Sequence, residues 1–340
     1  MLASSTLPDV NKVLLRTFAF LCLFSLPTVV LAQWYKESQS QMGTLIVVEF
    51  WLEAKDSEAK ACQAAVFNEM RRIDEAFSPY KTGSELSRVN REAHHHAVKI
   101  SKELYVLLEK SLAMSRLSQG AFDISFASIG FRYDYRNSKK PSEKEISSLI
   151  KSINYRKIIL DAGTQTVRFT DKKVKIDLGG IAKGYAVDNG IAILEKCGIR
   201  HALVSAGGDS RVIGDRGDRP WMIGIKHPRK AKGVVTALPL VDSAFSTSGD
   251  YERFFIQDGV RYHHIINPKS GKSAKSVMSV TIIGPDAVTT DALSTTVFVM
   301  GIEKGLALIE SMSDTDAVII DVRGKMHFTS GLEAAGETGH

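Results

Sequence analysis

Two residues near the C-terminal end of the chain have the types and spacing of a metal site. Asp291 and Thr295 stand four positions apart in the stretch TTDALSTTVFVMG (289–301), so a helix would place both on one face. Both offer oxygen, and Mg²⁺ needs few protein oxygens because water and ligand phosphates complete its coordination. The spacing equally fits a structural role, in which Asp291 only favours the positive end of a helix capped by Thr290.

Glycine-containing stretches could bring the backbone close to an anion. KIDLGGIAKGYAVD (175–188) has Gly179, Gly180 and Gly184 between a predicted strand and a predicted helix. This layout leaves backbone N–H groups free at a helix N-terminus. VSAGGDSRVIG (204–214) repeats the theme after another apolar stretch. Neither has the spacing of a dinucleotide fingerprint or a Walker sequence, and a tight turn accounts for each as well as a ligand does.

Basic side chains accompany these stretches. Lys183 could pair with a phosphate, or it could only solvate the start of the helix. His263 and His264 are adjacent, and a strand would direct them to opposite faces, so only one would face a given site. A histidine near a phosphate could act as a general base, although an exposed histidine on a sheet is the commoner case. The histidines at 94–96 are expected in a solvated turn.

Composition and charge indicate a globular protein that does not bind nucleic acid. The 340 residues are 44% hydrophobic, which is ample for a core, and the net charge is only +6. Lys and Arg are spread along the chain instead of clustering with aromatic residues, as a nucleic-acid surface would require.

The N-terminal residues indicate export. Lys12 and Arg16 precede the apolar run 17–32, which is typical of a secretory signal cut after Ala32. An uncleaved signal would instead hold the protein at the membrane. Cys22 lacks the small preceding residue of a lipoprotein signal, so lipid attachment is not expected.

After that cut only Cys62 and Cys197 remain, which are compatible with two buried thiols or with one disulfide bridge.

Hydrophobic periodicity predicts a single intertwined α+β unit with mainly antiparallel sheets and flanking helices. Helices are expected at 57–77 with Ser57 as N-cap and at 101–119 with Ser101 as N-cap. Strands outnumber helices, and no internal repeat or linker divides the chain. Further helices are predicted at 85–93, 147–153, 182–198, 290–300 and 302–312, and strands at 44–53, 157–161, 166–170, 173–178, 201–206, 221–226, 234–240, 243–248, 252–257, 262–267, 279–284, 317–321 and 326–329.

Taken together and in this order, several stretches resemble the ApbE family, the FAD:protein FMN transferases. They are MGT (42–44), FSPYKTGSELSRVN (77–90), GAFDIS (120–125), IDLGGIAKGYAVD (176–188), SAGGD (205–209), STSGDYERFF (246–255), HHIINPKSG (263–271) and TTDALSTTVFVMG (289–301). The likeness spans roughly 42–332. It implies a T-fold-related unit over 33–340, following a signal peptide at 1–32.

The resemblance implies an exported, periplasmic or inner-membrane-associated enzyme that uses FAD as substrate and requires Mg²⁺. Such an enzyme moves FMN from FAD to a Ser or Thr hydroxyl of a partner flavoprotein, for example a subunit of a respiratory redox complex, and releases AMP.

The resemblance also implies roles for individual residues. Asp291 and Thr295 would bind Mg²⁺, assisted by Ser294 and the Gly180 carbonyl, and His264 would assist the transfer. The residues implied to lie against FAD are Met42, Tyr80, Ala121, Phe122, Asp123, Asp177, Lys183 and Ile265.

Two other functions fit the same residues. A Mg²⁺-dependent pyrophosphatase would hydrolyse FAD to FMN and AMP. In the family Tyr at the position of Tyr80 accompanies transfer and Asn accompanies hydrolysis, so this chain is expected to transfer. An exported flavin-binding protein without turnover is disfavoured by the pair Asp291 and Thr295, because passive flavin binding needs no divalent metal.

Overall fold

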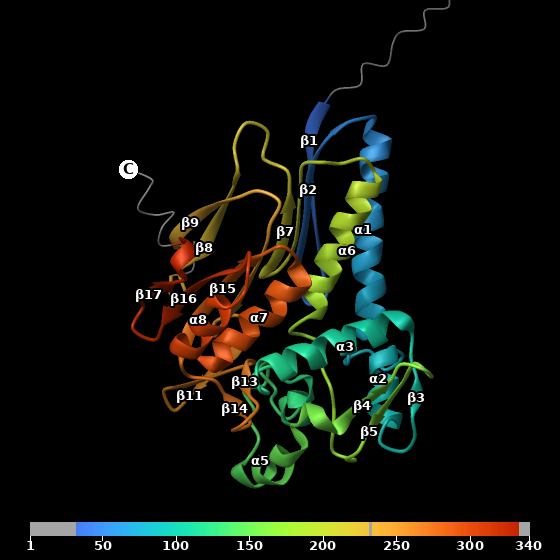
Figure 1. Cartoon of the computed structure of the whole chain (residues 1–340), viewed down its shortest axis with the longest axis vertical. Helices are drawn as coiled ribbons and strands as arrows, with labels where there is room; N and C mark the ends of the chain where they lie inside the picture. The colour runs from blue at the N-terminus through green and yellow to red at the C-terminus, as the bar shows by residue number, and fades with distance from the viewer. Residues whose placement is uncertain (1–31, 231–232, 333–340) are drawn as a thin grey trace, which may run out of the picture.

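A large antiparallel sheet forms the centre of the fold (Figure 1). The computed structural model describes residues 32–230 and 233–332, and within them the sheet has eight strands. All pairings between neighbouring strands of this sheet are antiparallel, which confirms the α+β prediction. In order across the sheet, the strands are β1 Ala32–Gln41, β2 Thr44–Glu53, β6 Ala202–Ala206, β7 Asp209–Ile213, β10 Ala244–Gly249, β15 Val277–Gly284, β16 Asp316–Asp321 and β17 Met326–Phe328.

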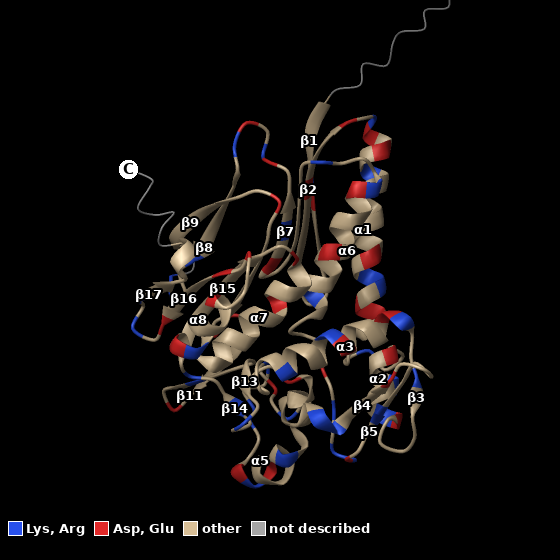
Figure 2. Cartoon of the chain, in the orientation of Figure 1, with Lys and Arg blue, Asp and Glu red and all other residues tan. Residues whose placement is uncertain are grey.

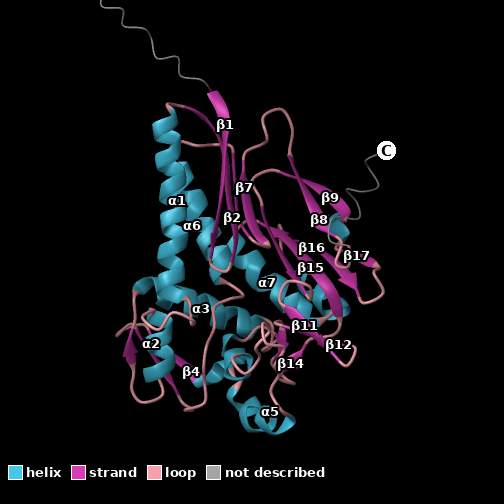
Figure 3. Ribbon diagram, turned by 180° about the vertical axis from the view of Figure 1, so that it is seen from behind, coloured by secondary structure: helices cyan, strands magenta, loops and turns pink. Residues whose placement is uncertain are grey.

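Helices cover one face of this sheet. They are α1 Asp56–Phe77, α6 Ala182–Lys196, α7 Ala287–Met300 and α8 Ile302–Glu310. The view from behind shows α6 and α7 on the far side of the strands (Figure 3). Apolar residues recur along α1 at helical spacing, and Val66, Met70 and Ile73 are fully buried. The helix α7 is buried on almost every side because α6, α8 and the sheet surround it.

A hairpin covers part of the opposite face. It consists of β8 Trp221–Lys226 and β9 Val234–Leu240. Trp221 packs with Val212 and Ile283, and Ile225 packs with Val318, so both faces of the central strands are covered. For this reason every residue of β15 is buried, and its sequence lacks the alternation of apolar and polar residues that is typical of a strand with one face in solvent.

Smaller elements form the end of the molecule below α7 in Figure 1. They include a three-stranded sheet, two short hairpins and several helices. Their bounds are α2 Glu85–Glu92, β3 Val98–Lys99, α3 Lys102–Leu117, α4 Ala127–Gly130, α5 Glu143–Leu149, β4 Ile158–Asp161, β5 Thr166–Phe169, β11 Phe254–Gln257, β12 Val260–His263, β13 Ile266–Asn267 and β14 Lys272–Ser273, with 3₁₀ turns at Ile124–Phe126, Ile150–Ser152 and Tyr155–Lys157.

The predicted strand at 173–178 is wrong. This segment runs extended, but side chains satisfy its backbone in place of a neighbouring strand. Asn90 donates to the Ile176 carbonyl oxygen and accepts from the Ile176 N–H, both at 2.8 Å. The joint before α6 therefore follows an extended segment that is anchored on α2.

Three other expectations also differ from the structure. The helix α1 begins after Lys55, so Ser57 lies inside it and is not the N-cap, whereas Ser101 caps α3 as predicted. The expected strand at 262–267 is divided into β12 and β13. The strand β1 was not predicted, because its polar side chains belong to an exposed edge strand that lacks an alternating apolar pattern.

Cys62 on α1 and Cys197 at the end of α6 form a disulfide bridge, which settles the alternative that the sequence left open.

The predicted signal segment lies outside the described residues, apart from Ala32 at the start of β1. Within the described part of the chain, no helix is both long and apolar enough to cross a membrane. Acidic and basic residues are interspersed along the helices and loops of the chain (Figure 2).

Candidate active site

Helices α6 and α7 approach each other so closely that a glycine is required where they touch. A Cβ on Gly184 would lie 2.0 Å from the carbonyl oxygen of Ala287 and 2.9 Å from the Cβ of Asp291. Four residues earlier, a Cβ on Gly180 would lie 3.4 Å from the hydroxyl oxygen of Thr295. Asp291 and Thr295 therefore share the face of α7 that meets the start of α6, as their spacing predicts.

The partly exposed Lys183 and the buried carboxylates of Asp209 and Asp291 form a cluster of charges. The Lys183 ammonium contacts the Asp209 carboxylate and lies 3.8 Å from Oδ1 of Asp291. Oδ2 of Asp291 accepts a hydrogen bond of 3.0 Å from the Gly184 N–H. Burial and the charge of Asp209 raise the pKa of Asp291. Burial by itself lowers the pKa of Lys183, but the two carboxylates outweigh it and the pKa lies above its ordinary value.

Hydroxyl groups surround the cluster on the side of Thr295. The Ser248 oxygen at the end of β10 lies 2.8 Å from the Ser294 hydroxyl and 3.2 Å from the Thr295 hydroxyl. Ser294 also donates to the backbone carbonyl of Asp291 at 2.9 Å. Sequence reasoning identified Ser294 but missed Ser248, because a serine in a polar strand carries no signal of its own.

The residues predicted to bind Mg²⁺ fit that ion. In the described ranges no three His, Cys, Asp or Glu side chains are grouped so that they could hold a metal, so charged ligands alone do not make a site there. The oxygens available near Asp291 are instead hydroxyl and backbone oxygens, which hard cations accept. The cluster also sets two carboxylates against one ammonium, and a cation would offset the remaining negative charge.

The prediction that His263 and His264 stand together on one strand is wrong, because β12 ends at His263. The ring of His263 is fully engaged within the chain. Its Nε2 lies 2.7 Å from the Ala274 carbonyl oxygen, and its Nδ1 accepts from the Ile265 N–H at 3.3 Å. His263 therefore holds the following residues in place, including buried Ile265.

His264 has a free ring nitrogen. Its Nδ1 is buried and makes no hydrogen bond within the described part of the chain. Its backbone N–H donates to the Arg253 carbonyl at 3.1 Å. Burial and the charge of Arg253 lower the pKa of His264 to about 3, so the imidazole is neutral near pH 7.

Asp177 and Tyr80 are placed very differently from each other. Asp177 is buried and accepts from the Gly179 N–H at 2.7 Å, which fixes the bend of the glycine joint. The Tyr80 side chain is 74% exposed and meets Phe131 edge to face, with 6.1 Å between ring centroids. An exposed aromatic ring of this kind is available to stack on a planar ligand.

Met42 lies at the tip of the hairpin between β1 and β2. Met42 and Gly43 have φ angles of 53° and 69°, as a two-residue hairpin turn of the right twist requires. Met42 is half-buried and packs against the main core.

The stretch from Ala121 to Asp123 lines the other side of the glycine joint. Phe122 is buried, and its ring would lie 3.3 Å from a Cβ on Gly180. Ala121 is half-buried. Asp123 uses both carboxylate oxygens within the chain, since Oδ1 accepts from the Ser125 N–H at 2.9 Å and Oδ2 from the Tyr155 N–H at 2.8 Å.

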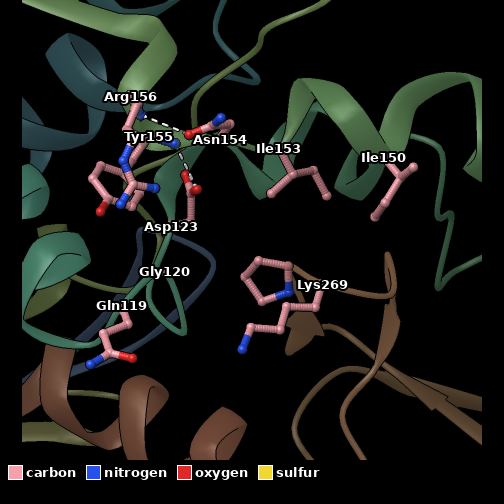
Figure 4. Close-up of a pocket in the computed structure, with 10 residues that line it drawn as sticks. Gln119, Gly120, Asp123, Ile150, Ile153, Asn154, Tyr155, Arg156 and Lys269 are labelled. Carbon is pink, nitrogen blue, oxygen red and sulfur yellow. Dashed lines mark hydrogen bonds between the residues drawn. The ribbon is translucent and has the colours of Figure 1, made fainter.

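A cavity of about 320 Å³ opens beside Asp123 (Figure 4). In Figure 4 the Asp123 carboxylate points towards Tyr155 and Asn154, and Lys269 lies across the cavity on a separate segment. The residues that line the cavity are Gln119, Gly120, Asp123, Ile150, Ile153, Asn154, Tyr155, Arg156, Pro268 and Lys269.

The second glycine pair is explained by packing. Gly207 and Gly208 form the turn between β6 and β7, and Gly207 has a φ of 68°. A Cβ on Gly207 would lie 2.5 Å from the Thr44 hydroxyl, and one on Gly208 would lie 2.6 Å from the Thr247 carbonyl oxygen. The contribution of this turn to the site is Asp209, which contacts Lys183 and was not among the predicted site residues.

Comparison with known proteins agrees with this arrangement. The model of the ApbE family matches residues 42–319. An FAD:protein FMN transferase of Treponema pallidum is 30% identical over 320 residues, covering 88% of this chain and 87% of that protein. Another of Klebsiella pneumoniae is 29% identical over 290 residues, covering 84% of this chain and 89% of that protein.

Solved structures are similar over almost the same range. The crystal structure of the ApbE protein of Thermotoga maritima matches with a TM-score of 0.82 and 34% identity, covering 89% of this chain and 99% of that one. The flavin transferase ApbE of Vibrio cholerae matches with a TM-score of 0.80 and 26% identity, with the same coverage of both chains.

Proposed function

We propose, because the chain belongs to the ApbE family, that it transfers the FMN moiety of FAD to a Ser or Thr hydroxyl of a target flavoprotein and releases AMP. The observation that carries this proposal is the meeting of α6 and α7. It puts the oxygens of Asp291 and Thr295 beside the glycine joint at Gly180 and the Lys183 ammonium. Metal ligands, a cation and accessible backbone are the components that phosphoryl transfer requires.

Asp291, Thr295, Ser294 and the Gly180 carbonyl would hold Mg²⁺. Oδ2 of Asp291 is bound to the Gly184 N–H, which leaves Oδ1 for the ion. When bound, Mg²⁺ would offset the negative charge of the FAD pyrophosphate and of the departing AMP. The close contact at Gly184 keeps Asp291 in a fixed position relative to the joint.

His264 would accept the proton of the incoming hydroxyl. In the transfer, the hydroxyl oxygen forms a bond to the phosphorus attached to the flavin, and the bond from that phosphorus to the bridging oxygen breaks. The electron pair leaves with AMP, and the proton passes to the imidazole of His264. Burial and Arg253 disfavour the imidazolium in the free protein, but the negative charge of bound FAD acts in the opposite direction.

The remaining predicted residues would hold the substrate. Exposed Tyr80 would stack on the flavin ring, and Met42 would border it from the β1–β2 turn. The cavity beside Asp123 would take a further part of FAD.

The target would be an exported protein, and the transferase itself would act outside the cytoplasm. The apolar run at 17–32 and the bridge between Cys62 and Cys197 both support this location, since disulfides form in oxidising compartments. If the signal is not cut, it would also hold the enzyme at the inner membrane.

AMP formation tests this function. The protein from residue 33 onwards is incubated with FAD and Mg²⁺, with and without an exported flavoprotein subunit, and AMP is quantified by chromatography. AMP should form only when both the subunit and Mg²⁺ are present, and EDTA should stop it. AMP formation that needs no acceptor would overturn the proposal.

A further inference from the structure

Arg253 has no role in the site described so far, but it lies beside several of its residues. It follows β10, immediately before β11, and it is exposed. Its Nη2 lies 3.1 Å from where a Cβ on Gly43 would stand, so the guanidinium rests against the hairpin turn that carries Met42. Its carbonyl oxygen accepts from the His264 N–H at 3.1 Å. The side chain of Arg253 thus contacts the turn before β2, and its backbone binds His264.

The guanidinium of Arg253 is not engaged by the described part of the chain, where it makes neither a hydrogen bond nor a salt bridge. The two nearby arginines differ in this respect. Arg229 contacts Asp250 at 2.6 Å with each of two nitrogens, and the Arg261 guanidinium lies 4.0 Å from Asp250 and over the ring of Phe254. Arg253 therefore retains its donors for a group that comes from outside the chain.

The charge of Arg253 acts on four residues of the site. Burial raises the pKa of Tyr80, and Arg253 opposes that rise. Burial lowers the pKa of His264, and Arg253 lowers it further. Burial raises the pKa of Asp177, and Arg253 opposes that rise. Arg253 also opposes the rise of the pKa of Lys183 that the two carboxylates cause. A cation that acts on all four residues lies close to the site.

The site needs such a cation. Lys183 is the expected partner of the FAD phosphates, but it already contacts Asp209 and lies near Asp291. These two carboxylates offset the positive charge of its ammonium group. A pyrophosphate brings further negative charge. An arginine fork with free donors can bind two oxygens of one phosphate side by side.

We propose that Arg253 binds the phosphate that stays attached to the flavin, and that it stabilises the oxygens of that phosphate during transfer. This inference rests on the proposed function. The flavin phosphate is chosen over the AMP phosphate because the backbone carbonyl of Arg253 accepts from the His264 N–H, and His264 must lie near the phosphorus that the incoming hydroxyl attacks. The contact with the Met42 turn points the same way, because Met42 is predicted to border FAD.

The test compares the binding of four ligands in the presence of Mg²⁺. Affinities for FAD, FMN, riboflavin and AMP are measured by titration calorimetry for the wild type, Arg253→Gln and Arg253→Lys. In Arg253→Gln, FAD and FMN should bind about 10- to 100-fold more weakly, because a charge-assisted contact is lost. Riboflavin and AMP lack this phosphate and should keep their wild-type affinities. Arg253→Lys should be intermediate.

The control is Arg168→Gln, which removes an exposed arginine from β5 and should change none of the four affinities. Unchanged FAD and FMN binding in Arg253→Gln would overturn the inference, and so would equal losses for FMN and riboflavin or a loss confined to AMP. Each of these outcomes would contradict only the role of Arg253. If the wild-type protein still transfers FMN, the proposed function stands. A wild type that binds no flavin ligand would instead contradict the proposed function and, with it, the inference.

Discussion

Asp291 has two separate tasks, one for each carboxylate oxygen. Oδ2 holds the Gly184 N–H of α6, and Oδ1 faces Lys183 and is available to a cation. An asparagine could keep the first task but not the negative charge of the second. Substitution at this position therefore separates the packing of the two helices from metal binding.

Asp291→Asn is predicted to slow FMN transfer by at least about 100-fold and to raise the Mg²⁺ concentration needed, because a charged ligand of the ion is lost. Initial rates measured across a Mg²⁺ titration give both the maximal transfer rate and the Mg²⁺ concentration that half of this rate requires. Mg²⁺ should also raise the melting temperature of the wild type but not that of the variant.

The matched control is Asp286→Asn on the same helix. Asp286 caps α7 by accepting from the Thr289 N–H, and asparagine caps equally well, so activity and stability should stay close to wild type. An Asp291→Asn protein with normal rate and normal Mg²⁺ dependence would remove Asp291 from the metal site.

The residues of the site differed in how well the sequence could predict them. The spacing of Asp291 and Thr295 predicted that both lie on one face of a helix, and α7 confirms this, whereas their role as metal ligands stays a prediction. Asp209, Ser248 and Arg253 carry no such pattern. They reach the site from a turn, a strand end and an exposed loop, and only the fold brings these segments together.

At the scale of elements, the contact between α6 and α7 positions the site. Gly184 lets the two helices meet, and Asp188 of α6 accepts from the N–H groups of Ala287 and Val288 at the start of α7. The three glycines of the joint thus serve different purposes. Gly184 permits helix packing, whereas Gly179 and Gly180 shape the joint beside Asp177 and Thr295.

Gly184→Ala is predicted to lower the free energy of unfolding by roughly 2 kcal/mol or more, because the added methyl group meets the Ala287 backbone, which cannot rotate away. Transfer should fall as well, since α7 must shift. Urea unfolding followed by circular dichroism measures the first effect.

Gly83→Ala is the control, because a Cβ at Gly83 would meet nothing within 4 Å. Its stability should equal or slightly exceed that of the wild type. If Gly184→Ala were as stable as Gly83→Ala, the α6–α7 contact would be looser than described.

Most elements could be predicted from hydrophobic periodicity, and the exceptions have local causes. The helices α1, α3, α6 and α7 lie where expected, within a few residues, although α7 is apolar on almost every side. The segment at 173–178 has the composition of a strand, but Asn90 occupies its backbone groups. The strand β1 pairs along its whole length with β2 despite a polar sequence, because an edge strand needs no second buried face.

At the scale of the molecule, one disulfide bridge joins the helices α1 and α6, which both cover the sheet. Cys62 and Cys197 are 135 residues apart in sequence, so the bridge closes a long loop of the unfolded chain. Two widely spaced cysteines gave no indication of pairing, since pairing depends on α1 and α6 lying side by side.

The bridge is predicted to leave no free thiol in the mature protein. Iodoacetamide should label neither cysteine before reduction and both after it, as intact mass shows. Removing the bridge by Cys62→Ser with Cys197→Ser should lower the free energy of unfolding by about 2–4 kcal/mol. Two labels on the unreduced protein would contradict the bridge and weaken the case for export.

The intact mass of an acceptor protein tests the central claim most directly. The mature protein, FAD and Mg²⁺ are incubated with an exported flavoprotein subunit, and the subunit is analysed by mass spectrometry with and without EDTA. The account predicts a mass gain equal to one FMN phosphoester, located on a Ser or Thr and lost with EDTA or with Asp291→Asn. Free FMN and AMP beside an acceptor of unchanged mass would show that water, and not a protein hydroxyl, receives the phosphoryl group.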